Sequence, residues 1–136
     1  MKIILYTDGG CAGNDQRDLS KRKMISVVTN QFGDVLVDKH QEGGSNNIAE
    51  LQAVKEALLW AITHNYDEVE IRTDSRNNFA WVFGKKVGKN INDRVTIMIL
   101  KTAIEAVRQT LKDFRIEWIG RDLNLAGHYI EQKYQL

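Results

Sequence analysis

The sequence of 136 residues contains no proline and only one cysteine, Cys11. A single cysteine excludes a disulfide within the chain and is typical of proteins from a reducing compartment. An excess of charge is missing as well, since 19 Lys and Arg against 18 Asp and Glu give a formal net charge of +1. No general positive field therefore attracts a polyanion, and any surface for nucleic acid would be local.

Long hydrophobic runs are also lacking. The apolar run in the N-terminal segment MKIILYTDGG stops at an acidic turn. It is too short to cross a membrane and lacks the small-residue cleavage site of a signal peptide, so we expect a cytoplasmic protein. Because repeats, low-complexity segments and linkers are absent, we expect a single domain over residues 1–136, free-standing and monomeric.

What is present is the periodicity of an α/β domain with a mixed sheet. Strands are expected at residues 3–6, 25–29, 35–39, 68–73 and 114–118, and helices near 47–62, 76–83, 93–111 and from 124 onward. The first and fourth strands should be parallel neighbours, since a helix crosses over between them. The expected inward positions of the two long helices are Leu51, Val54, Leu58 and Ile62, and Val95, Met98, Thr102 and Ala106.

Three acidic residues stand where such a sheet places a site. Asp8 is expected to end the first strand, Asp74 ends the fourth, and Glu50 is expected in the first turn of the helix between them. The carboxyl ends of neighbouring parallel strands meet at one edge, so these side chains should converge. Clustered carboxylates repel one another and usually bind a divalent cation, here Mg²⁺ or Mn²⁺. The alternative is that each acid is an ordinary strand-end or helix residue.

The segments YTDGGCAGN, SNNIAELQAVKEAL, IRTDS and IEWIGRDLNLA resemble, in order, the sequence blocks of type 1 ribonuclease H. The resemblance implies the ribonuclease H-like fold, a five-stranded mixed sheet flanked by helices. It also implies an endonuclease that hydrolyses the RNA strand of RNA–DNA hybrids with two metal ions. We expect no obligate protein partner. By the same resemblance Asp8, Glu50 and Asp74 are metal ligands and catalytic residues, with Asp8 bridging both ions.

By the same resemblance, five short residues contact the hybrid: Gly13, Asn14, Ser45, Asn46 and Asn47. Their amides and hydroxyls suit phosphate and the RNA 2′-hydroxyl, although they also suit turns and helix caps.

Basic residues near the expected cleft are further candidates. Arg76 lies near this cleft and is a candidate phosphate ligand. The loop with Lys85, Lys86 and Lys89 resembles a reduced form of the basic handle of the family, or else is simply a solvated loop.

The last helix departs from the family pattern. The family commonly begins this helix with an Ala-Asp pair, and here Ala126 is followed by Gly127 where the fourth acid is expected. His128 is the candidate replacement, as a metal ligand or a general base, and imidazole suits Mn²⁺ better than Mg²⁺. Glu131, one turn further on, could act through a water. The other reading of His128 is a surface histidine.

Two further functions stay open at this stage. The first is a catalytically weak nucleic-acid-binding module that keeps the fold. The second is another nuclease of the same superfamily that acts on DNA strands. Retention of Asp8, Glu50 and Asp74 together favours an enzyme over a binding module.

Overall fold

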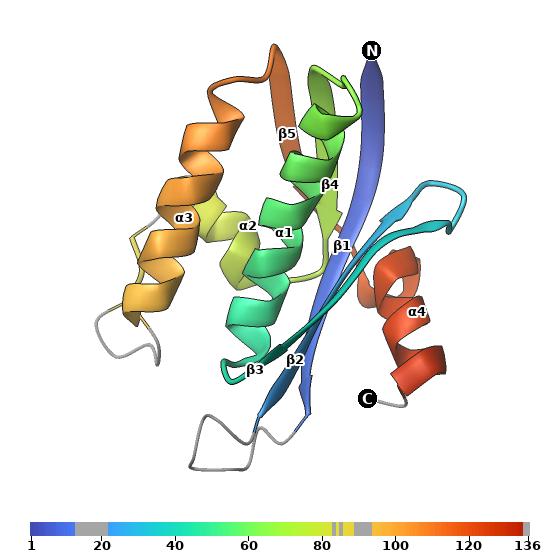
Figure 1. Ribbon diagram of the computed structural model, residues 1–136, viewed down its shortest axis with the longest axis vertical. Helices are drawn as coiled ribbons and strands as arrows, with labels where there is room; N and C mark the ends of the chain where they lie inside the picture. The colour runs from blue at the N-terminus through green and yellow to red at the C-terminus, as the bar shows by residue number, and fades with distance from the viewer. Residues whose placement is uncertain (13–21, 83, 85, 89–93, 135–136) are drawn as a thin grey trace.

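A long central strand, β1 (Lys2–Ala12), organises a five-stranded mixed sheet of order β3-β2-β1-β4-β5 (Figure 1). The computed structural model describes residues 1–12, 22–82, 84, 86–88 and 94–134. As predicted, β1 pairs in parallel with β4 (Glu68–Thr73), and it pairs antiparallel with β2 (Lys23–Asn30). The outer strands are β3 (Val35–Glu42), antiparallel to β2, and β5 (Asp113–Trp118), parallel to β4.

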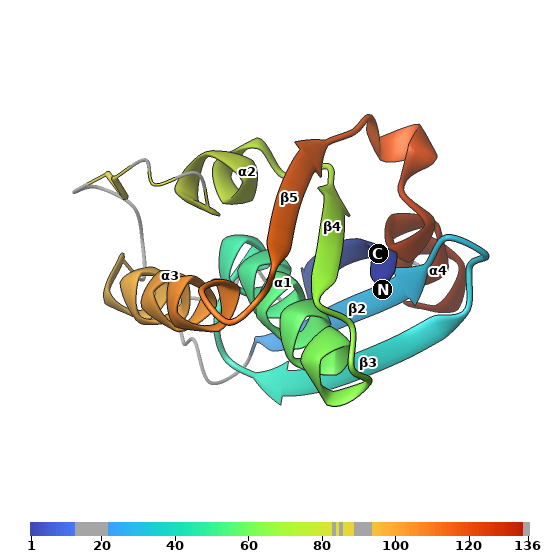
Figure 2. The same cartoon turned by 90° about the horizontal axis from the view of Figure 1, so that it is seen from above.

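Helices cover both faces of this sheet (Figure 2). One face carries α1 (Asn46–Thr63) and, packed against it, α3 (Arg94–Arg108); the other carries α4 (Leu125–Tyr134). A short helix, α2 (Arg76–Val82), follows β4, and a 3-10 turn, η2 (Arg121–Leu123), precedes α4. The larger core lies under α1 and α3, and a smaller one forms where Ala126 and Ile130 of α4 meet Ile25 and Val27 of β2.

The predicted inward face of α3 is wrong. Val95 and Met98 are 69% and 42% exposed, and Thr102 and Ala106 are exposed as well. The helix instead buries a stripe formed by Ile97, Leu100 and Ile104. Both stripes have helical spacing, so periodicity alone does not decide between them. The stripe of α1 is confirmed through Leu58 but not at Ile62, which is 38% exposed.

The course of β1 also differs from the prediction. Asp8 does not end the strand, because β1 continues to Ala12 and pairs Asp8 with Val27 of β2. The parallel ladder with β4 does stop at Thr7 and Thr73, so Asp8 lies where β1 loses its neighbour on that side. The site edge expected from the ends of β1 and β4 is therefore present, although of these two strands only β4 ends there.

A cluster of polar contacts fixes the far end of α4 to β3. Asp38 Oδ2 accepts hydrogen bonds from the hydroxyls of Tyr129 and Tyr134, both at 2.7 Å, and from Lys133 Nζ at 3.2 Å. Burial of Asp38 favours a higher pKa, but these hydrogen bonds outweigh it and lower the pKa below its usual value. The carboxylate therefore stays ionised and anchors the helix whose first turn borders the site.

Among the described residues, no helix combines the length and apolarity needed to cross a membrane.

Candidate active site

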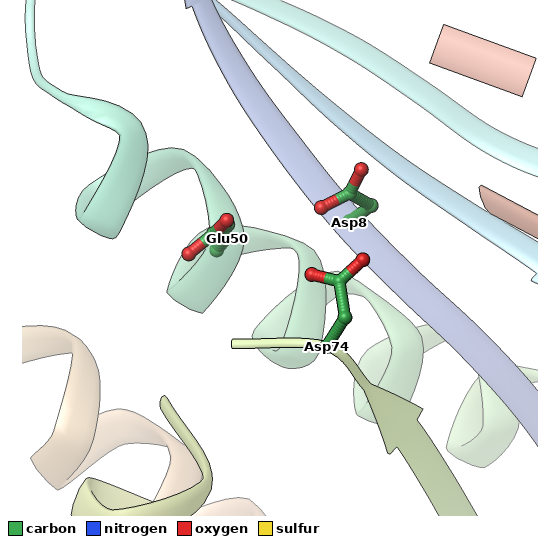
Figure 3. A group of neighbouring side chains, drawn as sticks. All are labelled: Asp8, Glu50 and Asp74. Carbon is green, nitrogen blue, oxygen red and sulfur yellow. The ribbon is translucent and has the colours of Figure 1, made fainter. Parts of the chain in front are cut away.

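The predicted carboxylates come together at the point where β1 and β4 part. Asp8 projects from β1, Asp74 follows the last residue of β4, and Glu50 reaches over from α1 (Figure 3). One ligand oxygen from each of these residues lies within 4.8 Å of the other two. Glu50 lies in the second turn of α1 and not in the first as expected, because the helix begins at Asn46.

Gly9 lets α1 approach the strand that carries Asp8. A Cβ atom at this residue would lie 2.3 Å from the carbonyl carbon of Ala49 and 2.4 Å from the Glu50 nitrogen. Only a residue without a side chain fits beside this helix backbone. The close approach places Glu50 next to Asp8, and the nearby Ser75 hydroxyl favours the ionised form of Glu50 and so opposes the rise in its pKa.

Asp8 and Glu50 lie in an environment that disfavours their charged forms. Burial, followed by the neighbouring Asp74 carboxylate, raises the pKa of Asp8 to about 7. Burial, followed by the charge of Asp8, raises the pKa of Glu50 to about 8. The Arg121 guanidinium opposes both shifts without abolishing them. Without a compensating cation, the cluster therefore takes up protons near neutral pH.

A divalent cation would supply the missing positive charge. Carboxylate oxygens are the hard ligands that Mg²⁺ and Mn²⁺ prefer. The set of donors, their convergence within 4.8 Å and the raised pKa values of Asp8 and Glu50 all fit such an ion.

Asn124 connects the last helix to this cluster. The side chain is fully buried, and its Nδ2 donates to the Thr7 carbonyl oxygen at 2.9 Å and to Asp74 Oδ2 at 3.2 Å. Its Oδ1 accepts from the backbone nitrogens of Ala126 and Gly127 at 3.1 and 3.4 Å and so caps α4. One amide thus joins the start of α4, the strand before Asp8 and the Asp74 carboxylate.

The first turns of α4 border Asp8. A Cβ atom at Gly127 would lie 3.1 Å from Asp8 Oδ2. Glu131 is near enough to raise the pKa of Asp8 and is paired with Arg121 at 3.0 Å. His128, half-buried, stands between these two positions on the helix, but it adds no atom to the group of three converging acids. Its predicted role stays a prediction.

Arg76 lies on the other flank of the cluster. It is the first residue of α2, and its guanidinium carbon lies 4.9 Å from the centre of the Trp118 ring. The indole Nε1 of Trp118 donates to the carbonyl oxygen of Asp74 at 3.1 Å. Both side chains are exposed, Trp118 by 43%.

The other predicted substrate contacts show structural roles where they can be described. Ser45 caps α1, its hydroxyl accepting from the Ile48 nitrogen at 3.3 Å. Asn47 Oδ1 accepts from Asn77 Nδ2 at 3.4 Å, while Asn46 is exposed. A cap or turn role does not conflict with substrate binding, so their part in binding stays a prediction. Gly13, Asn14, Lys85 and Lys89 lie outside the described residues, and Lys86 is exposed.

Sequence reasoning missed three contributors to the site. Gly9 was assigned to a turn, whereas it makes room for α1. Ser75 caps the start of α2, its hydroxyl accepting from the Asn78 nitrogen at 3.2 Å, and it also opposes the rise in the pKa of Glu50. Trp118 ends the strand expected at residues 114–118 and lies opposite Thr73, the residue before Asp74. This register is a property of the folded sheet, so the sequence pattern does not single Trp118 out.

Comparison with known proteins gives a family match. The sequence model of the RNase H family matches residues 1–121. No curated protein sequence matches the chain.

Solved structures are similar over most of the chain. RNase H1 from the halophilic archaeon Halobacterium salinarum NRC-1 covers 100% of both chains with a TM-score of 0.72 and 20% identity. The N-terminal RNase H domain of a Mycobacterium tuberculosis protein, solved as a fusion with maltose-binding protein, covers 95% of both with a TM-score of 0.73 and 20% identity. LC11-RNase H1 in complex with an RNA/DNA hybrid covers 90% of this chain and 88% of its own, with a TM-score of 0.61 and 24% identity. These likenesses confirm the predicted fold.

Proposed function

The chain belongs to the ribonuclease H family, and from this premise we propose that it is an endonuclease hydrolysing the RNA strand of RNA–DNA hybrids with two divalent cations. The observation that carries the proposal is the convergence of Asp8, Glu50 and Asp74 within 4.8 Å. A similar fold is known in complex with an RNA/DNA hybrid, which supports the choice of substrate.

The three carboxylates would hold the cations, Mg²⁺ or Mn²⁺. When bound, such a pair of ions activates water and stabilises the leaving oxygen in phosphodiester hydrolysis. The chain supplies the ligand oxygens and orients the Asp74 carboxylate through the Asn124 amide, while the Ser75 hydroxyl lies near Glu50. Such outer contacts set the geometry of metal ligands.

His128 would act from the α4 side of the cluster. Its neighbours on the same helical face, Gly127 and Glu131, both border Asp8. The ring lies four residues after Asn124 and hence one turn above the residue that contacts Asp74. We assign it either a nitrogen ligand to a cation or the acceptance of a proton from the attacking water.

Substrate contacts would come from the rims of the cluster. Arg76 offers a cation to phosphate on the α2 side. Asn46 and Asn47, at the start of α1, offer amides to the sugar–phosphate backbone and the 2′-hydroxyl. Ser45, Gly13 and Asn14 complete the proposed binding set, the last two lying outside the described residues.

The test is cleavage of an end-labelled RNA–DNA hybrid in Mg²⁺ and, separately, in Mn²⁺. Cleavage of the RNA strand that Asp8→Asn abolishes, with the DNA strand intact, is the expected result. Matched DNA and RNA duplexes serve as control substrates. Hydrolysis of the DNA duplex in preference to the hybrid would instead identify a nuclease acting on DNA strands.

The alternative function is a nucleic-acid-binding module without significant catalysis. It is favoured by the absence of a fourth acid at residue 127. Two results together would support this alternative. The hybrid would bind with an affinity that falls with salt, and neither the parent protein nor Asp8→Asn would cleave it in either metal.

A further inference from the structure

Trp118 connects two parts of the candidate site. It is the last residue of β5 and pairs with Thr73, the residue before Asp74. Its indole Nε1 donates to the carbonyl oxygen of Asp74 at 3.1 Å. The hydrogen bond holds the backbone from which one of the three converging carboxylates projects.

The same indole also holds Arg76. The guanidinium carbon lies 4.9 Å from the ring centre, within the range of a cation–π contact. Among the residues that the structure describes, Arg76 forms no ion pair with a carboxylate. Its charge therefore stays available to an anion while its position is restricted.

Simple packing does not account for Trp118. The side chain is 43% exposed and is not part of either hydrophobic core. In the described part of the chain, its ring face meets Arg76 and its ring N–H donates to Asp74, and both partners are residues of the site. An arginine restrained before binding loses less side-chain freedom when it meets a phosphate, which strengthens binding.

We propose that Trp118 is a positioning residue that acts through two contacts, orienting Arg76 for a substrate phosphate and fixing the backbone of the metal ligand Asp74. This inference rests on the proposed function for its substrate half. Its metal half needs only that the carboxylate cluster binds a divalent cation.

Three substitutions separate the two contacts. Trp118→Phe removes the ring N–H but keeps an aromatic face for Arg76. Arg76→Ala removes the cation but leaves the bond to Asp74 intact. Trp118→Leu removes both. Controls are Trp60→Phe, a stacked tryptophan on α1, and Arg115→Ala, an exposed arginine on β5.

Hybrid binding is measured with metal chelated, so that no hydrolysis occurs, at several salt concentrations. Arg76→Ala should lower the slope of log affinity against log salt by about one, the contribution of a single phosphate contact. Trp118→Leu should weaken binding about two- to fivefold by releasing the guanidinium. The double variant Arg76→Ala/Trp118→Leu should lose no more than Arg76→Ala alone. Additive losses would show that Trp118 does not act through Arg76 and would overturn this half.

Metal binding is measured by calorimetric titration with Mn²⁺ alone. Trp118→Phe should weaken the affinity about two- to tenfold, the range for one lost hydrogen bond. Arg76→Ala and both controls should leave the Mn²⁺ affinity unchanged. Equal Mn²⁺ affinity in Trp118→Phe and the parent protein would overturn the metal half.

The two proposals fail in different ways. A parent protein that binds Mn²⁺ but no hybrid contradicts the proposed function and the Arg76 half, while Trp118→Phe still decides the metal half. A different outcome is a parent protein that binds and cleaves the hybrid while none of the three substitutions changes binding or cleavage. That result would agree with the proposed function and would overturn the role of Trp118.

Discussion

A Cβ atom added to Gly127 would lie 3.1 Å from Asp8 Oδ2, so the last helix meets the first carboxylate through bare backbone. A side chain at this residue would require the Asp8 carboxylate to shift by a few tenths of an ångström. The residue at which the fourth acid is expected therefore packs its backbone tightly against Asp8. His128, the next residue, is only half-buried and has more room for a functional side chain.

Replacing His128 by aspartate should raise the cleavage rate in Mg²⁺ and reduce any preference for Mn²⁺. An acid at this residue adds a hard oxygen ligand one turn after Asn124, whereas imidazole suits Mn²⁺. Gly127→Asp should instead lower the rate, because its Cβ crowds Asp8 Oδ2. The measurement is the rate of hybrid cleavage by both variants in each metal.

Gly127→Ala is the matched control, since it adds the crowding atom without an acid. It should lower the rate as Gly127→Asp does. A rate in Mg²⁺ that rises with Gly127→Asp but not with His128→Asp would return the fourth ligand position to residue 127.

The sequence alone predicts the framework of the site well. Strand and helix periods are short-range signals, and the parallel pairing of β1 with β4 follows from the helix crossover between them. These two facts suffice to predict that Asp8 and Asp74 meet, and Glu50 on the connecting helix follows.

Local sequence patterns do not predict which distant residues contact one another. The bond from Trp118 to the Asp74 carbonyl spans 44 residues and involves a backbone atom, so no residue type signals it. The approach of α1 to Gly9 likewise depends on how closely two elements pack. The face of α3 was mispredicted because Val95 and Met98 share the helical spacing of the buried stripe.

The metal-free protein should lose stability as the pH rises from about 5 to 8. The pKa values of Asp8 and Glu50, about 7 and about 8, lie above the ordinary values of 3.8 and 4.5. The folded state therefore binds more protons than the unfolded state in this pH window. The stability that Asp8 and Glu50 contribute is fully present below about pH 4. It is lost as the pH rises through their pKa values in the folded state. Thermal melts in EDTA should show a decrease of roughly 5 °C or more.

Two comparisons test the cause of this decrease. Asp8→Asn, which cannot ionise at that residue, should flatten the pH dependence, whereas Asp113→Asn at an exposed site should not. Excess Mn²⁺ should raise the melting temperature more at pH 8 than at pH 5, because it binds the ionised cluster. An unchanged pH profile in Asp8→Asn would contradict the assignment.

Asn124→Ala should lower the free energy of unfolding by about 2–4 kcal/mol, because the helix cap and two buried hydrogen bonds are lost together. Asn124→Ser restores a capping oxygen only, so it should recover part of the stability and none of the contact with Asp74. Urea unfolding gives the stability, and Mn²⁺ titration gives the metal affinity. Gln132→Ala, at an exposed residue of the same helix, should change neither quantity. Equal Mn²⁺ affinity in Asn124→Ser and the parent protein would remove Asn124 from the support of the site.

Gly9→Ala tests whether the close approach of α1 and β1 builds the cluster. The new Cβ would lie 2.3 Å from the Ala49 carbonyl carbon, and main-chain atoms of a helix cannot yield as a side chain does. The helix must move away, which should cost about 3 kcal/mol of stability and carry Glu50 out of reach of Asp8. Mn²⁺ affinity should therefore fall with the stability.

Gly33→Ala provides the control, because Gly33 lies in the β2–β3 turn with a φ of 85° and no atom within 4 Å of an added Cβ. It should cost about 1–2 kcal/mol of backbone strain without altering Mn²⁺ binding. If Gly9→Ala lost stability but bound Mn²⁺ as the parent does, Glu50 would not depend on the contact between Gly9 and α1. The site would then have to tolerate a displaced helix, and the packing at Gly9 would serve the fold alone.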